Sequence, residues 1–145
     1  MTIRKDYILR MIEELATAVA RAMGFRRQGL LDEAIRVVEE ASRSVVGMDL
    51  ELAGAVDAAT LAGMLTDPSR MAALARLMLE RAEIAADLGD GALDAAWRRR
   101  AVELWLEAFA AGGEARLDAV AREAVVTAPE DALSPRARAL RAQLG

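Results

Sequence analysis

Apolar residues recur every three or four positions along most of the chain, which is the period of an amphipathic α-helix. The first such stretch, residues 6–23, places Ile8, Ile12, Leu15 and Val19 on one face. Other stretches with this period cover 31–45, 68–88, 92–111 and 117–125, residues 50–65 favour two shorter helices, and a last short helix follows Pro135. No stretch alternates polar and apolar residues for long, as a half-buried strand would. The pattern therefore predicts an all-α protein of about six or seven helices.

Residues typical of helix ends punctuate these stretches. Side chains that can accept a hydrogen bond from the first helical turn precede four of them: Asp49, Asp57, Asp67 and Ser134. Pro68 and Pro135 then occupy the first helical position, where a missing N–H is no loss. Gly24 is expected to end the first helix, Gly47 the second and Gly112-Gly113 the helix over 92–111.

The same periodicity selects the residues that face the core. They are expected to include Met23 in the first stretch, Val45 in the second and Leu88 at the end of 68–88, and, in the less regular segment 50–65, Leu52, Val56 and Met64. No Pro- or Ser-rich linker interrupts the helices, so residues 1–145 are interpreted as one domain, with a packed joint at 49–67.

The joint between the first two helices has a distinctive spacing. Gly29 can take a left-handed turn conformation at little cost, and Ala34 is small enough to let the second helix lie close to the first. The stretch Phe25-x3-Gly29-x-Leu31-x2-Ala34-x3-Val38-x2-Ala41 resembles the inter-helix half of a tetratricopeptide repeat. A looser copy, Gly91-x-Leu93-x2-Ala96, repeats only the first part of this spacing.

A second resemblance covers most of the chain. The opening segment 6–14, the joint at 29–34 and the segment 101–108 together resemble a bacterial family of uncharacterised tetratricopeptide-like helical proteins. This resemblance implies antiparallel helical hairpins in a right-handed stack or bundle, and it implies no reaction.

Composition and charge exclude several classes of function. Of 19 Lys and Arg residues only Lys5 is a lysine, a bias typical of a GC-rich bacterial genome. With 23 Asp and Glu the net charge is −4, which disfavours nucleic-acid binding. No apolar run reaches the roughly 18 residues of a membrane span, and the N-terminus carries no signal-peptide core, so a cytoplasmic protein is expected.

Candidate chemistry is sparse. The chain has neither Cys nor His, so thiolate metal sites and His-based acid–base catalysis are excluded. Adjacent carboxylates such as Glu13-Glu14 point about 100° apart on a helix and do not converge by themselves. We therefore expect no enzyme activity, no metal and no cofactor, and a hydrolase using a carboxylate-held metal ion is one rival hypothesis.

The sequence leaves an interaction surface as the remaining candidate site. It consists of Trp97, Trp105 and Phe109, which lie roughly on one side of a helix, with Arg98 and Arg99 beside them. The aromatic residues either fill the core or, where exposed, anchor a partner. Arg98 is expected to pair with Asp94, Arg36 with Asp32 and Arg43 with Glu39.

These observations predict a non-enzymatic protein-interaction module, either an adaptor or a self-associating scaffold. Its partner would be a protein or peptide, with a second copy of the chain as one case, and the binding surface a helical groove with arginines at the rim. The alternative is a small-molecule-sensing regulatory protein with a cavity between helical hairpins.

Overall fold

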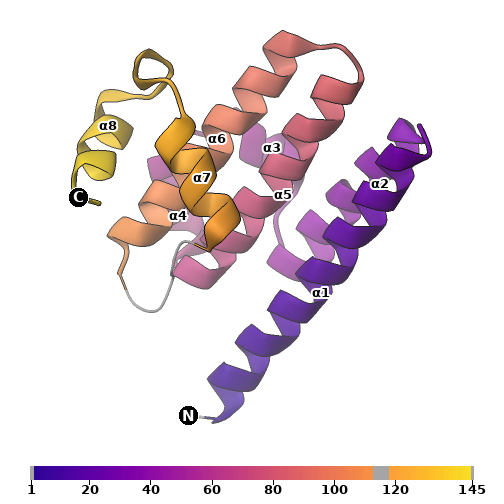
Figure 1. Ribbon diagram of the computed structural model, residues 1–145. Helices are drawn as coiled ribbons and strands as arrows, with labels where there is room; N and C mark the ends of the chain where they lie inside the picture. The colour runs from indigo at the N-terminus through magenta and orange to yellow at the C-terminus, as the bar shows by residue number, and fades with distance from the viewer. Residues whose placement is uncertain (1, 113–117, 145) are drawn as a thin grey trace.

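The computed structural model describes residues 2–112 and 118–144, and every regular element in these ranges is a helix (Figure 1). This confirms the all-α prediction. The described α-helices are α1 (Thr2–Arg27), α2 (Leu31–Ala41), α3 (Leu50–Ala55), α4 (Ala58–Leu65), α5 (Pro68–Asp87), α6 (Gly91–Ala110), α7 (Ala119–Thr127) and α8 (Pro135–Ala142). They number eight rather than six or seven. A π-helical turn, η1 (Ser42–Val46), and a 3₁₀ turn, η2 (Glu130–Ala132), complete the elements. The predicted helix start at Leu117 and the predicted break at Gly113 lie outside the described residues.

The helices begin where their capping side chains predict. Asp49, Asp57 and Asp67 accept hydrogen bonds from the backbone N–H groups two or three residues later, and Ser134 does the same for α8. Asp90 and Asp118 cap α6 and α7 in the same way. Each cap satisfies a donor that a helix leaves unpaired at its N-terminus. The helices α3 to α8 thus begin at a local side-chain signal, whereas α2 begins after Leu30 without a side-chain cap.

The centre of the molecule is the antiparallel pair α5 and α6, which lie side by side in Figure 1. α5 also packs against α1, α2 and α4, whereas α6 packs against α4, α7 and α8. Leu74, Leu77 and Leu104 at this centre have no exposed surface. The two short helices α3 and α4 lie behind the pair in the view of Figure 1, and α7 lies in front. α6 is therefore covered on both of its flanks.

The joint between α1 and α2 has the predicted geometry with one correction. Gly29 adopts a left-handed φ of 76°, and Ala34 is fully buried. The prediction that Gly24 ends α1 is wrong, because the helix continues to Arg27. It ends where the N–H groups of Gly29 and Leu30 bond back to the carbonyls of Arg26 and Phe25, a pairing that requires the left-handed residue at Gly29.

The second hairpin closes in the same way, but not at the glycine that the repeat spacing selects. Gly89, with a φ of 79°, is the left-handed residue after α5, and Gly91 is the first residue of α6. Ala96, which the spacing aligns with Ala34, is exposed. The likeness of the two joints therefore lies in the helix cap and not in the Gly91-x-Leu93-x2-Ala96 copy.

A π-helical turn displaces the apolar stripe at the end of α2. Val45 was expected to follow Ala41 into the core at helical spacing, but it is half-buried, while Val46 is only 2% exposed. Bonding from residue i to i+5 adds one residue to the turn and so moves the stripe by one position. Arg70 of α5 holds this turn, because its guanidinium donates to the Val46 carbonyl at 2.7 and 3.1 Å.

Several residues that were expected to face the core are exposed. Leu52, Met64 and Leu88 are 51%, 48% and 50% exposed, and Val56 is half-buried. The prediction for Leu88 is wrong because α5 ends at Asp87 and Leu88 lies in the exposed turn that follows. The predictions for Leu52 and Met64 are wrong because short helices bury only a narrow stripe, which Leu50 and Ala53 form in α3 and Leu61 and Leu65 form in α4. These four side chains, all within 49–67, belong to the same core cluster as α5 and α6.

No helix in residues 2–112 and 118–144 combines the length and the apolar character that crossing a membrane requires.

Candidate functional site

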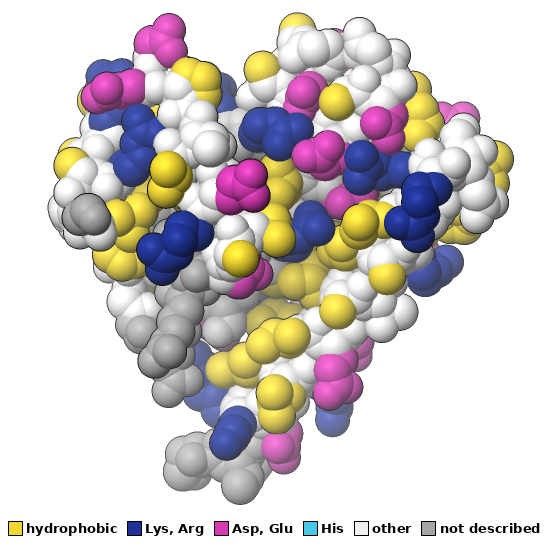
Figure 2. Space-filling model, in the orientation of Figure 1, with side chains coloured by type: hydrophobic (Ala, Val, Ile, Leu, Met, Phe, Trp, Pro, Cys, Tyr) yellow, Lys and Arg dark blue, Asp and Glu magenta, His cyan; other side chains and the backbone are white. Residues whose placement is uncertain are grey.

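An open apolar groove separates α1 from α5. It has a volume of about 720 Å³ and is bordered by Ile8, Ile12, Leu15 and Met23 of α1, Ala72 of α5 and Trp105 of α6. We call this feature the apolar groove. Figure 2 shows it as a hollow beside α1, with hydrophobic side chains gathered along the α1 side. Its volume falls within the range of about 300–1,000 Å³ that is typical of binding pockets.

The groove exists because the apolar face of α1 is longer than the surface that covers it. Met11, Ala18, Val19 and Ala22 are buried, but Ile12 is 52% exposed and Met23 37% exposed. These two residues were expected to face the core, and that prediction is wrong. The first turns of α1 extend past the rest of the described chain (Figure 1), whereas Met23, near the other end of α1, borders the open groove beside α5. An apolar face of this kind on a surface helix is a feature of interaction sites.

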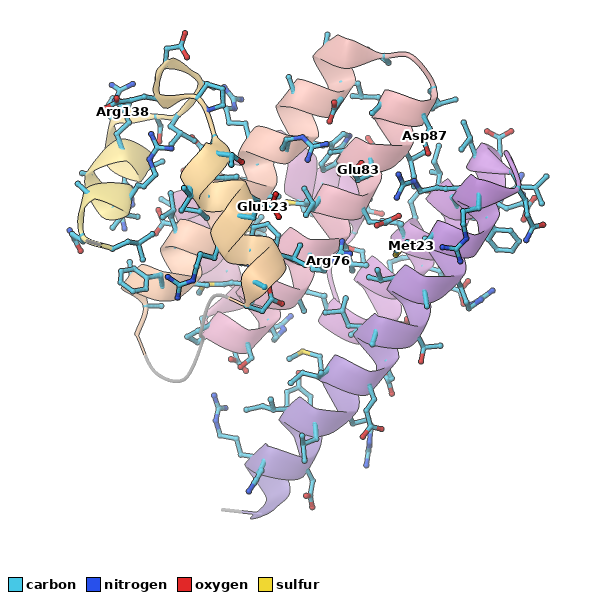
Figure 3. The ribbon with its side chains drawn as sticks, in the orientation of Figure 1. Met23, Arg76, Glu83, Asp87, Glu123 and Arg138 are labelled. Atoms are coloured by element: carbon cyan, nitrogen blue, oxygen red, sulfur yellow. The ribbon has the colours of Figure 1, made fainter. Side chains whose placement is uncertain are left out.

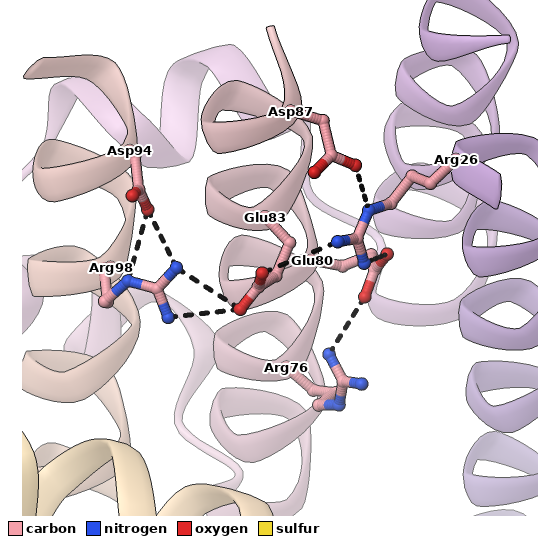
Figure 4. Close-up of polar contacts among 7 residues, drawn as sticks. All are labelled: Arg26, Arg76, Glu80, Glu83, Asp87, Asp94 and Arg98. Atoms are coloured by element: carbon pink, nitrogen blue, oxygen red, sulfur yellow. Dashed lines mark hydrogen bonds and ion pairs between the residues drawn. The ribbon is translucent and has the colours of Figure 1, made fainter. Parts of the chain in front are cut away.

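A network of ion pairs closes the other end of the groove by joining α1 to α5 (Figure 4). Arg26 of α1 reaches Glu80 at 3.0 Å, Asp87 at 2.9 Å and Glu83 at 3.5 Å. Burial lowers the pKa of Arg26, but hydrogen bonds to Asp87 and Glu80 outweigh that effect and raise its pKa above the ordinary value. Figure 3 shows Met23 on the side of α1 turned toward α5, below this network.

Glu80 is the most enclosed member of the network. It is 1% exposed, and Arg76 approaches its second carboxylate oxygen at 3.5 Å, one helical turn away on α5. A buried carboxylate is costly unless it is paired and hydrogen-bonded, and here Arg26 and Arg76 supply both contacts. The network therefore fixes the position of α1 on α5 at the end where α1 meets α2.

The predicted pair of Arg98 with Asp94 is present at 2.8 Å, and Arg98 also reaches Glu83 of α5 at 3.3 Å. Burial lowers the pKa of Arg98, but the hydrogen bond and the charge of Asp94 outweigh it, so its pKa is raised. The other two predicted pairings are replaced. Arg36 pairs with Glu33 and Arg43 with Asp49 at 3.8 Å, because other carboxylates lie closer than the predicted ones.

The five predicted partner-binding residues lie in different surroundings. Trp97 and Trp105 are 7% and 3% exposed and belong to the core, and Phe109 is half-buried. Trp105 lies at the floor of the apolar groove, whereas Trp97 and Arg99 border a separate pocket between α3 and α6. Arg98 belongs to the ion-pair network. The structure does not bring the five together into one surface.

That second pocket has a volume of about 490 Å³ and contains three arginines. Arg81 of α5 and Arg99 and Arg100 of α6 border it, together with Trp97 and with Glu51 of α3. We call it the arginine pocket. Sequence reasoning missed Arg81 as a candidate residue, although a signal was present. Arg81 falls between Leu77 and Ile84 at intervals of four and three, so it interrupts the buried stripe of α5 with a charge.

Within the described residues no group of three or more His, Cys, Asp or Glu side chains is arranged to hold a metal ion.

No known family model matches the chain. Neither a curated protein nor a solved structure matches it.

Proposed function

We propose that the chain is a non-enzymatic protein-interaction module, an adaptor or self-associating scaffold of tetratricopeptide-like helical hairpins, in which the apolar groove receives an amphipathic helix. The observation that carries this proposal is the open apolar face of α1 beside the groove. Ile12 and Met23 are exposed there, yet they lie opposite the buried indole of Trp105 and the small side chain of Ala72. A helix laid in this groove would cover apolar surface that is now in contact with water.

The dimensions of the groove support a helical occupant. Its α1 border extends from Ile8 to Met23, which at 1.5 Å per residue is about 22 Å, or roughly four helical turns. Helix-in-groove recognition uses apolar anchors at successive turns over a comparable length. The ion pairs of Arg26 lie at one end of the border, so a polar contact at that end would set the direction of the bound helix.

A second copy of the chain is the first partner to test. α1 is itself an amphipathic helix with an uncovered apolar face, and twofold symmetry lets two such faces bury each other. We expect light scattering at about 1–100 μM to give the mass of a dimer for the wild type. Ile12→Glu places a charge in the groove and is expected to give a monomer.

Leu9→Glu is the matched control. Leu9 is 48% exposed on the same helix, close to the 52% of Ile12, but it does not border the groove. The control is expected to remain dimeric. A wild type that is monomeric at every concentration contradicts self-association. The adaptor proposal would then be tested with an apolar fluorescent dye. We expect the dye to bind the wild type and Leu9→Glu equally well and to bind Ile12→Glu more weakly. Equal dye binding by all three proteins contradicts the groove as a binding surface.

The alternative function, a small-molecule-sensing regulator, is favoured by a different observation. The arginine pocket lies between α3 and α6 and does not share a bordering residue with the apolar groove. A saturable increase in melting temperature with a small anion supports this alternative.

A further inference from the structure

The arginine pocket contains a buried charge without a partner. Arg81 is only 9% exposed, and within residues 2–112 and 118–144 its Nε and one terminal guanidinium nitrogen, NH1, have no hydrogen-bond acceptor. Arg70, on the same helix, instead donates to the carbonyls of Val46 and Leu65. Because a guanidinium stays protonated in proteins, Arg81 keeps its charge and its unsatisfied donors. Both nitrogens are closed off from solvent, so an acceptor that enters the adjacent pocket reaches them only when the Arg81 guanidinium turns toward it.

The charges around the pocket favour an anion. Three arginines and one carboxylate, that of Glu51, border it, and the carboxylate of Asp57 lies near enough to Arg100 for their charges to interact. Arginines thus outnumber carboxylates around the pocket. The whole chain carries −4. The net charge of the chain therefore repels anions, and an attraction to this pocket must come from its own arginines.

The three guanidinium groups reach the pocket from different depths. Arg81 is the innermost, Arg99 is exposed, and Arg100 is held in place because it donates to the backbone carbonyl of Val56. Guanidinium groups bind carboxylates and phosphates through paired N–H donors in a plane. Arg81 and Arg99 both border the pocket and both carry donors of this kind.

The remaining wall of the pocket is apolar and closely packed. Trp97 and Leu93 of α6 border it, and the indole of Trp97 lies against the backbone of Gly54 in α3. A Cβ added at Gly54 would lie 2.7 Å from the Trp97 ring, so α3 can approach α6 this closely only at a glycine. This wall suits the hydrocarbon or flat part of a small organic anion, and the pocket volume of about 490 Å³ has room for it.

We propose that the arginine pocket binds a small organic anion whose carboxylate or phosphate group is held by Arg81 and Arg99. This proposal does not depend on the function of the apolar groove. Its ligand draws the Arg81 guanidinium toward the pocket, where the oxyanion accepts from the donors that are now enclosed, and places its apolar part against Trp97. Carboxylate and phosphate ligands both present an oxyanion to the arginines, and the experiment below distinguishes between them.

Inorganic phosphate and succinate are the two probes, titrated at constant ionic strength with sodium chloride as the balancing salt. We expect at least one of them to raise the melting temperature saturably and to bind in calorimetry. Binding of phosphate alone assigns a phosphate ligand, and binding of succinate alone assigns a carboxylate. Binding of both supports an oxyanion site. No saturable binding of either probe overturns the proposal.

Four variants locate the site. Arg81→Met and Arg99→Gln are each expected to weaken binding about tenfold or more, because each removes charged hydrogen bonds. Glu51→Gln removes the one carboxylate of the pocket and is expected to tighten binding. Arg122→Gln, on an exposed residue of α7, removes the same charge elsewhere and is expected to leave binding within about twofold of the wild type.

The stability of Arg81→Met without added anion is a separate readout. Methionine keeps much of the apolar stem and removes the unpartnered charge, so the melting temperature of the free protein is expected to rise. Arg99 is exposed, so Arg99→Gln tests the site even if the Arg81 variant folds poorly. Wild-type affinity in both pocket variants, or an equal loss of affinity in Arg122→Gln, overturns the proposal.

Discussion

α1 and α5 are both long helices rich in alanine and arginine, but they are covered very differently. Twelve of the twenty residues of α5 are buried. In α1, four of the described side chains are buried, those of Met11, Ala18, Val19 and Ala22. α5 packs against α1, α2, η1, α4 and α6, whereas the main neighbours of α1 are α2, η1 and α5. The number of surrounding helices, and not the apolar content of the helix itself, decides how much of its surface is removed from water.

The same sequence pattern can therefore describe either a core face or an exposed binding face. An apolar stripe shows which side of a helix is apolar, but it does not show whether another helix covers that side. In α5 the stripe is a core, and in α1 its outer half borders the apolar groove. Substitutions in the two helices are therefore expected to act on different properties.

The largest expected difference is between Leu77 and Ile12. Leu77 has no exposed surface, so Leu77→Ala is expected to lower the free energy of unfolding by about 2–5 kcal/mol. Ile12 is half exposed in the single chain, and Ile12→Ala is expected to change the free energy of unfolding of the monomer by less than about 1 kcal/mol. Urea unfolding followed by circular dichroism, at protein concentrations below those of self-association, measures both. Equal losses under these conditions would show that the face of α1 is covered within the monomer.

The contact between the two helices is tested next, at Glu80. Glu80→Gln keeps the shape of the side chain but removes the buried charge that Arg26 and Arg76 share. We expect a loss of about 1.5–3 kcal/mol, since hydrogen bonds to charged groups contribute that much and Arg26 retains Glu83 and Asp87. Glu33→Gln, which breaks an exposed pair with Arg36, is the control and is expected to lose less than about 1 kcal/mol. Similar losses in both variants would contradict a structural role for Glu80.

Two glycines extend the comparison of covered and open positions to the short helices. A Cβ at Gly54 would meet the ring of Trp97, so Gly54→Ala is expected to destabilise the protein by about 1–3 kcal/mol. No atom lies within 4 Å of a Cβ at Gly63, and Gly63→Ala is expected to stabilise it by about 0.4–1 kcal/mol through a higher helix propensity. Thermal unfolding measures both signs. A stabilised Gly54→Ala would show that α3 does not approach α6 this closely.

The smallest expected effect is at Asp57, an exposed cap. The side chain and backbone of Thr60 donate hydrogen bonds to its carboxylate and lower its pKa from the ordinary 3.8. A lowered pKa in the folded state stabilises the protein above the unfolded pKa, and this contribution is lost as pH falls through the folded pKa. Asp57→Asn keeps a capping oxygen and cannot titrate, so unfolding midpoints of the two proteins are expected to converge below about pH 4. A difference that is constant between pH 7 and pH 3 would contradict this.

Local signals predicted the elements well, because they act within a few residues. Asp49, Asp57, Asp67 and Ser134 cap the helices that they were expected to cap, and Gly29 closes the first joint. The errors arise where the outcome depends on distant neighbours. Ile12, Leu52 and Met64 carry the right period for burial, but no helix lies over them.

The candidate sites were predictable only in part, for the same reason. Sequence reasoning selected Trp97 and Arg99, which border the arginine pocket, and Trp105, which borders the groove. It did not separate these residues into two sites, because the separation depends on where α1 and α3 pack. Arg81 was missed because a charged residue at a position of the apolar stripe was not considered as a candidate for burial.

The π-helical turn η1 holds one residue more than an α-helical turn in its place would. Deleting one residue from 42–45 would place Val46 four positions after Ala41, where regular α-helical bonding keeps it on the apolar stripe. A deletion inside α5 has no such compensation, because it would rotate every later residue of the helix by about 100° and turn its buried stripe out of the core. We therefore expect the chain to tolerate the loss of one residue in η1 better than the loss of one residue in α5.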